Sequence, residues 1–193
     1  MSELSAKFPD VDPFILKKWE RVFNAFFDRD SSRTVEKHDF YLVIRKVRDI
    51  YGAESAQMTY AKESLNALWD GLMQLADKNK DEVIQLEEWI NALKTTGGKT
   101  EATWFNNYMT YMFKLFDVSA DKVLDIAEYT DGMCAYGFSE SEAKEAFKRF
   151  AVDERGKPIR ALPLAHFKRL WNEYFHSTDK KLLGNNLFGL IKE

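Results

Sequence analysis

Three short polar segments of the chain repeat one arrangement of oxygen-bearing side chains, at residues 28–39, 77–88 and 117–128. Each segment has an aspartate at position 1, oxygen-bearing side chains at positions 3, 5 and 9, and a carboxylate at position 12. In a tight loop these groups can converge on one point. Hard divalent cations take about six to eight oxygen ligands, so the spacing predicts cation binding.

The candidate ligands are side-chain oxygens, together with the backbone carbonyl at position 7. In the first loop they belong to Asp28, Asp30, Ser32, Thr34, Glu36 and Asp39. In the second loop they belong to Asp77, Asn79, Asp81, Val83, Gln85 and Glu88. In the third loop they belong to Asp117, Ser119, Asp121, Val123, Asp125 and Glu128.

Apolar residues recur three and four positions apart on both sides of each loop, as on the faces of amphipathic helices. Phe23 and Phe27 precede the first loop, for example, and Phe40 and Val43 follow it. Acidic residues also cap helices, so a single acidic loop between helices would be ordinary. Capping does not explain three copies of one oxygen spacing. The sequence therefore predicts calcium-binding EF-hand units.

A fourth helix–loop–helix unit surrounds the gap at residues 152–163. Aligned with Ile159 at position 8, this gap has no oxygen-bearing side chain at position 1 or 12. Position 8 of the other loops holds Val35, Ile84 and Leu124, through which paired loops can join by a short strand contact. We expect the fourth gap to be structural, with Ile159 paired with Leu124. The prediction is an all-α fold of four EF-hand units in two packed pairs.

The three loops depart from the usual EF-hand pattern in two ways. Position 6, normally glycine, holds Arg33, Glu82 and Lys122, and a non-glycine residue at positive φ costs on the order of 1 kcal/mol. Position 12 of the first loop holds Asp39, one methylene shorter than glutamate. A single contact from Asp39 would favour the octahedral geometry of magnesium. We expect calcium in all three loops, most strongly in the second and third, with magnesium as the alternative ion in the first.

A polar stretch at residues 94–103 separates two halves of the chain. Residues 1–98 carry the first two units, and residues 99–193 carry the third, the degenerate fourth and a tail. The tail, residues 182–191, is rich in leucine and phenylalanine, and its glycines allow a turn across a surface. We predict that the tail folds back on a compact body and covers the groove that an EF-hand sensor offers to a target helix.

Composition argues against several functional classes. The 193 residues carry a formal net charge of −3 with no basic stripe, so we expect no nucleic-acid binding. No segment approaches the roughly 20 apolar residues of a membrane span, and Ser2 excludes N-terminal myristoylation, so no stable membrane anchor is expected. A single cysteine, Cys134, favours a reducing, cytoplasmic setting. We expect a monomer, and the sequence identifies no protein target.

Several segments resemble the invertebrate sarcoplasmic calcium-binding protein family, in particular its calexcitin-like branch. They are RVFNAFFDRD, LWDGLMQLADKNKDEVIQLEEW, NYMTYMFKLFDVSADKVLDIAEY, and RLWNEYF with the tail sequence GNNLFG. The resemblance covers residues 17–190. It implies a compact molecule of four EF-hands with calcium or magnesium in the first three loops. Aspartate at position 12 of the first loop and a degenerate fourth loop are both usual in that family.

The same branch includes proteins described as juvenile hormone diol kinases, which makes an enzyme an alternative. The fragment GGKT at residues 97–100 is the candidate for phosphate binding. A phosphate loop needs glycine five residues before its GK pair, where this chain has Leu93, and it should follow a strand instead of a helix. We interpret the fragment as a linker. A calcium buffer or signalling protein is favoured over a small-molecule kinase, and a sensor that binds a target helix is a third hypothesis.

Overall fold

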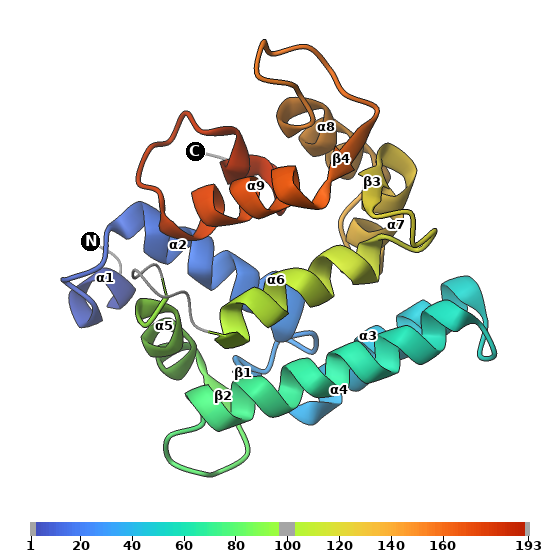
Figure 1. Cartoon of the computed structure of the whole chain (residues 1–193). Helices are drawn as coiled ribbons and strands as arrows, with labels where there is room; N and C mark the ends of the chain where they lie inside the picture. The colour runs from blue at the N-terminus through green and yellow to red at the C-terminus, as the bar shows by residue number, and fades with distance from the viewer. Residues whose placement is uncertain (1–2, 97–102, 192–193) are drawn as a thin grey trace.

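The computed structural model describes residues 3–96 and 103–191, so the GGKT fragment lies outside the described residues. The chain is mainly helical, which confirms the predicted all-α class (Figure 1). No described helix is long and apolar enough to cross a membrane. The elements in chain order are α1 (Glu3–Lys7), α2 (Pro13–Val22), a π-helical turn η1 (Phe23–Phe27), β1 (Thr34–Val35), α3 (Lys37–Tyr51), α4 (Ala56–Ala76), β2 (Ile84–Gln85), α5 (Leu86–Lys94), α6 (Thr103–Phe116), β3 (Val123–Asp125), α7 (Ile126–Ala135), α8 (Glu140–Phe150), β4 (Ala161–Pro163), α9 (Leu164–His176) and a 3-10 turn η2 (Leu183–Asn186).

Local chemistry explains where α2 begins and which face it buries. The Asp12 carboxylate accepts a hydrogen bond from the Phe14 backbone N–H at 2.8 Å, which caps the helix. Pro13 occupies the first helical position, where its fixed φ suits the helix and its missing N–H costs nothing. Leu16 and Trp19, three residues apart, are buried. Helix α2 thus presents one apolar stripe to the core and leads directly into the first loop.

Helices α3 and α4 form a long hairpin along one side of the molecule (Figure 1). The chain turns at Gly52, whose φ of +89° is open to glycine without steric cost. Helix α4 begins after Ser55, whose hydroxyl oxygen accepts from the Met58 N–H at 3.1 Å. Phe40 of α3 and Trp69 of α4 meet edge to face with ring centroids 5.3 Å apart. Helix α4 also packs against α6, which joins the hairpin to the second half.

Two short antiparallel ladders join the loops in pairs, as predicted. In the first, β1 pairs with β2 and Val35 lies opposite Ile84. In the second, β3 pairs with β4 and Leu124 lies opposite Leu162. The predicted pairing of Leu124 with Ile159 is therefore wrong, although the predicted partner loop is right.

The length of the fourth loop explains this difference. Thirteen residues, 151–163, separate α8 from α9, whereas nine separate the helices of each other unit. The added residues make a turn of their own, in which the Asp153 N–H donates to the Lys157 carbonyl at 2.8 Å. The position opposite Leu124 therefore falls on Leu162. Ile159 lies before the ladder and is only partly buried.

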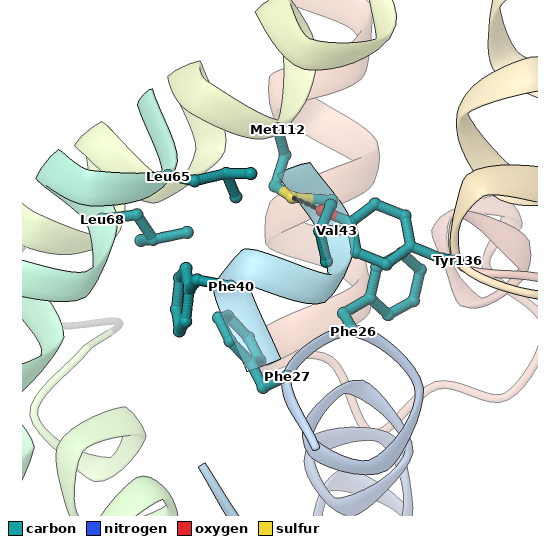
Figure 2. A pocket seen from close by; sticks show the side chains of 8 residues that line it. All are labelled: Phe26, Phe27, Phe40, Val43, Leu65, Leu68, Met112 and Tyr136. Atoms are coloured by element: carbon teal, nitrogen blue, oxygen red, sulfur yellow. Dashed lines mark hydrogen bonds between the residues drawn. The ribbon is translucent and has the colours of Figure 1, made fainter. Parts of the chain in front are cut away.

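One continuous cluster of buried hydrophobic side chains runs through both halves of the chain. Figure 2 shows its centre, where Phe27, Phe40, Leu65, Met112 and Tyr136, from five different segments, surround a cavity of about 10 Å³. The Tyr136 hydroxyl lies 4.0 Å from the Met112 sulfur. A cavity of this size holds about one water molecule. The two EF-hand pairs therefore share a filled core with no internal room for an organic ligand at this point.

The tail folds back and buries its apolar side chains, as predicted. Phe188 packs against Phe26 of η1 and Tyr174 of α9, with ring centroids 4.9 Å apart in both cases. The Tyr129 hydroxyl donates to the Leu187 carbonyl at 2.8 Å. Leu187 and Phe188 are fully buried. The tail is thus part of the core.

A buried lysine ties three segments together beneath the tail. Lys18 of α2 is fully buried, and its ammonium donates to the Ser177 carbonyl at 2.7 Å and to the Asn185 Oδ1 at 3.1 Å. The nitrogen also lies 4.6 Å from the centre of the Phe14 ring. Burial lowers the pKa of Lys18 to about 8. The side chain therefore connects α2, the residue that follows α9, and the tail.

Candidate metal centres

Each loop curls around the aspartate at its first position, which comes directly after a helix. In the first loop, Asp28 Oδ1 accepts from the Ser32 N–H at 2.8 Å and Asp28 Oδ2 accepts from the Arg33 N–H at 3.0 Å. In the third loop, Asp117 Oδ2 accepts from the Lys122 N–H at 3.0 Å. These bonds draw the loop backbone around the carboxylate that a cation would contact first.

The first loop differs from the third in how the chain enters it. The Asp28 N–H donates to the Phe23 carbonyl five residues back at 2.9 Å, which closes the π-helical turn. The Asp117 N–H donates to the Phe113 carbonyl four residues back, as in an ordinary α-helix. Single π-helical turns are rare and occur often at functional sites. Here the turn sets the direction from which Asp28 enters the loop.

Two residues in each loop have left-handed backbone conformation. At position 6 the φ angles are +70° for Arg33, +62° for Glu82 and +69° for Lys122, as the missing glycines suggested. Position 4 is left-handed as well, which the sequence analysis missed; its residues are Ser31, Lys80 and Ala120. Each such residue costs roughly 1–2 kcal/mol. Bonds to the ligand carboxylates must offset this strain.

The carboxylate at position 12 ties the end of each loop to its beginning. Glu128 Oε1 accepts from the Ser119 N–H at 3.0 Å, and Glu128 Oε2 accepts from the Asp125 N–H at 3.2 Å. Asp39 and Glu88 receive the corresponding backbone bonds at the starts of α3 and α5. An ionised carboxylate has about four acceptor sites. Each position-12 group therefore keeps lone pairs for a cation.

The first and third loops each gather three carboxylates, with one oxygen of each group within 4.8 Å of the others. The triads are Asp28, Asp30 and Asp39 in the first loop, and Asp117, Asp121 and Glu128 in the third. Two members of each triad are buried, and Asp39 is only 1% exposed. The structure thus brings together three of the four charged ligands that the sequence predicted for each of these loops, and Glu36 and Asp125 lie outside the triads.

These triads fit a hard divalent cation. Within the described parts of the chain, no lysine, arginine or histidine forms an ion pair with Asp28, Asp39, Asp117 or Glu128. Burial, reinforced by the Asp30 charge, raises the pKa of Asp39, although hydrogen bonds from backbone N–H groups partly offset this. Buried carboxylates this close together need a counter-charge, and calcium and magnesium both prefer oxygen ligands.

The second loop is more open. The oxygens of Asp77, Asp81 and Glu88 do not converge as closely as those of the two triads, and all three side chains are at least partly exposed. The Asn79 side-chain N–H donates to Asp81 Oδ2 at 2.8 Å, and Asn79 Oδ1 accepts from the Asp81 N–H at 3.0 Å. The predicted ligands are adjacent in this loop, and closure on a cation would require them to rearrange.

The other predicted ligands fall on the strand and the helix start of each loop. Position 7 lies at or just before the short strand, at Thr34, Val83 and Val123. Position 9 is the N-cap of the following helix, at Glu36, Gln85 and Asp125. The hydroxyls at positions 5 and 3 face their loops: Ser32 Oγ donates to the Thr34 carbonyl at 3.1 Å, and Ser119 Oγ lies 3.4 Å from Asp117 Oδ1.

Backbone N–H groups near the start of each loop also shape the sites, and the sequence analysis missed them. The Arg29 N–H donates to Asp39 Oδ1 at 2.7 Å, and the Lys78 N–H donates to Glu88 Oε1 at 3.2 Å. Such bonds depend on backbone direction and not on residue type, so the sequence carries no signal for them.

Comparison with known proteins places these loops in a family, although no protein-family model matches the chain. Calexcitin-1 of Caenorhabditis elegans is 53% identical over 195 aligned residues, which cover 99% of this chain and 94% of that protein. The beta chain of sarcoplasmic calcium-binding protein from Penaeus sp. is 29% identical, with 89% of this chain and 94% of that protein covered. The solved structure of an amphioxus sarcoplasmic calcium-binding protein shares the fold, with a TM-score of 0.73 and 21% identity over 94% of this chain and 100% of that one.

The identity to calexcitin-1 extends over nearly the whole of both chains, so it covers all of the loops described above. Two of these relatives are named as calcium-binding proteins, which is consistent with the carboxylate triads in this chain. None of these comparisons favours the kinase alternative. This chain belongs to the sarcoplasmic calcium-binding protein and calexcitin family of EF-hand proteins, and it is a calcium-binding buffer or signalling protein.

Proposed function

We propose that the protein is a calcium buffer in which each of the first three loops holds one divalent cation through the ligands predicted above. The observation that carries this proposal is the pair of partly buried carboxylate triads, which form no ion pair with a described cationic side chain. The fourth loop, with Arg155 and Lys157 exposed in its added turn, binds no cation.

The three sites differ in strength. The third loop combines a gathered triad with glutamate at position 12 and binds calcium most strongly. The second loop has a full ligand set, but its oxygens must converge on binding, which reduces its affinity. The first loop has a gathered triad closed by the shorter Asp39.

Magnesium competes with calcium at the first loop. Both Asp39 oxygens already accept short backbone bonds, from the Arg29 N–H at 2.7 Å and from the Glu36 N–H at 2.8 Å. These bonds hold the short carboxylate back toward the loop backbone and favour contact through one oxygen. Coordination by fewer protein oxygens suits the smaller octahedral ion.

The buried tail supports a buffer over a sensor. A sensor responds to calcium by opening an apolar groove for a target helix. Here Leu187 and Phe188 are fully buried, and the Arg21 side chain donates to the Phe188 carbonyl at 3.2 Å. Burial of each such side chain is worth roughly 1.5–3 kcal/mol, so opening would have to displace several favourable contacts.

Titration calorimetry of metal-stripped protein tests the site assignment. Calcium alone should fill three sites, and saturating magnesium should weaken calcium binding at one of them. Glu128→Gln should remove the strongest site. The change replaces one oxygen of the carboxylate that closes the third loop by an amide nitrogen and removes its negative charge. Glu145→Gln, which changes an exposed carboxylate of α8 outside the loops, is the matched control. Three unchanged sites in Glu128→Gln would show that the third loop is wrongly assigned.

A further inference from the structure

A pocket of about 590 Å³ lies between the tip of the α3–α4 hairpin and the third loop. Its apolar lining includes Val47 of α3, Phe113 and Leu115 of α6, Val118 of the third loop and Leu164. Its volume falls within the range of about 300–1,000 Å³ that is typical of small-molecule sites. The cavity between Phe27, Phe40 and Met112, by contrast, measures about 10 Å³.

A hydrogen bond across the walls makes this hollow a pocket instead of a long groove. The Gln57 side-chain N–H at the start of α4 donates to the Val118 carbonyl of the third loop at 3.3 Å. The bond links the hairpin to the loop beside the apolar walls. A helix about 10 Å wide would need an open channel along its length. The shape therefore favours a small molecule over a helix from a partner protein.

Charged groups around the pocket favour an anion. Lys114 and Lys122 both line it, and no described carboxylate pairs with either ammonium group. Asp117 is the one acid among the described lining residues. Its carboxylate is turned into the third loop, where Oδ2 accepts from the Lys122 N–H at 3.0 Å and Oδ1 lies 3.4 Å from the Ser119 hydroxyl. A cation in that loop would also neutralise it.

Tyr60 also lines this pocket, and its phenol carries a hydrogen-bond donor. The Tyr60 hydroxyl is buried and makes no hydrogen bond of normal geometry within the described residues. Burial raises the pKa of this phenol, and the nearby Ser64 hydroxyl only partly offsets the shift, so the proton stays on at neutral pH. The Lys114 ammonium lies 5.9 Å from the centre of the Tyr60 ring. A cation and a residue with a neutral donor are thus neighbours in the lining of the pocket.

We propose that this pocket binds a monomeric amphipathic anion of the fatty carboxylate class. The hydrocarbon chain lies against Val47, Phe113 and Leu115, and the carboxylate faces Lys114 and the Tyr60 hydroxyl. A carboxylate that accepts from an ammonium and a phenol gains charge-assisted hydrogen bonds while its chain leaves water. The site lies outside the three calcium loops except for the wall that the third loop supplies.

A fluorescent fatty carboxylate, dansyl-undecanoate, tests this proposal on the calcium-loaded full chain at micromolar concentration, where calcium soaps stay dissolved. We expect saturable binding of one probe per protein, displacement by dodecanoate, and weaker displacement by dodecanol, which lacks the charge. Ala56→Trp places an indole in the pocket and should abolish binding. Ala53→Trp puts the same group on the hairpin turn outside the lining and should leave binding unchanged.

A charge reversal gives a second, independent variant. Lys114→Glu should weaken probe binding by about tenfold, the loss expected for a charge-assisted contact. Lys62→Glu makes the same change on the exposed face of α4 and should have no effect. Calcium titration of each variant verifies that the loops still fold. The proposal is overturned if the probe does not bind the wild type, if both tryptophan variants bind it equally, if dodecanol competes as well as dodecanoate, or if the two charge reversals behave alike.

Discussion

Leu124 and Leu162 lie opposite each other in the β3–β4 ladder, and both side chains are fully buried. Leu124 stands between Val123, whose carbonyl is a predicted ligand, and Asp125, the N-cap of α7. The partner strand comes from the fourth loop, which has no oxygen-bearing side chain at position 1 or 12. We therefore expect the fourth loop to support the backbone of the third loop without binding an ion itself.

Leu162→Ala should consequently weaken calcium binding in the third loop. A buried leucine replaced by alanine costs about 2–5 kcal/mol of stability. Part of this loss should destabilise the β3–β4 ladder, which holds the third loop in shape. A loss of about 1.4 kcal/mol there would lower the calcium affinity of the third loop about tenfold. Calorimetry should show the second site nearly unchanged. Ile159→Ala is the matched control, because Ile159 lies outside the ladder, and an equal loss in both variants would refute this account.

Asp39→Glu should shift the ion preference of the first loop from magnesium toward calcium. The added methylene lets the carboxylate reach the ion with both oxygens while it keeps its backbone bonds to Arg29 and Glu36. Calcium tolerates the extra contact and magnesium does not. Competition titrations of both ions against the variant measure the shift. Asp70→Glu, on the exposed face of α4, is the control, and an occupied first site with unchanged preference would contradict the prediction.

The repeated oxygen spacing predicted the loops, and the apolar residues around and within them predicted their helices and the pairing of the loops. Oxygen-bearing residues at positions 1, 3, 5, 9 and 12 identify a loop because coordination itself requires those residue types there. Apolar residues at position 8 predicted the pairing of Val35 with Ile84 for the same reason, since the ladder buries them.

What the sequence did not predict depends on backbone geometry. The left-handed residues at position 4, Ser31, Lys80 and Ala120, share no side-chain property. The π-helical turn before Asp28 contains only residues that suit an ordinary helix. The longer fourth loop misled the alignment, because Ile159 and Leu162 are equally apolar and only the folded ladder distinguishes them. The open second loop also follows from side-chain directions that spacing cannot give.

Truncation after Thr178 should expose the surface that the tail covers. The cut removes Leu187 and Phe188, which are fully buried against α7, α9 and η1. We expect the fluorescence of a hydrophobic dye to rise strongly in the calcium-loaded truncated protein and to stay low in the intact one. A strong calcium-dependent signal from the intact protein would instead favour a sensor.

A point variant separates exposure of the groove from general unfolding of the truncated chain. Phe188→Ala keeps the tail and its backbone bonds but removes the ring that packs against Phe26 and Tyr174. It should raise dye binding by less than the truncation does. Leu183→Ala changes a tail residue that is 36% exposed and should leave dye binding at the wild-type level.

The buried Lys18 should make the stability of the protein rise with pH over a defined window. Its pKa is about 8 in the folded chain because burial disfavours the charge, against the ordinary value of 10.5. Between these two values the unfolded chain binds a proton that the folded chain has lost. A rise in pH then favours the folded state, by at most about 1.4 kcal/mol per pH unit from this one group. Below pH 8 both states hold the proton and the slope disappears.

Urea unfolding of metal-stripped wild type and Lys18→Met at several pH values between 7 and 10.5 measures this effect. The stability of the wild type relative to the variant should be flat below pH 8 and increase above it, because methionine cannot titrate. Burial also raises the pKa of Tyr129 and Tyr174 in the folded chain, but both proteins share that contribution and the difference removes it. Lys17→Met, which removes an exposed lysine of the same helix, is the control and should show no such slope. A constant difference between wild type and Lys18→Met across the whole range would mean that the ammonium keeps its ordinary pKa, and that its bonds to Ser177 and Asn185 compensate fully for its burial.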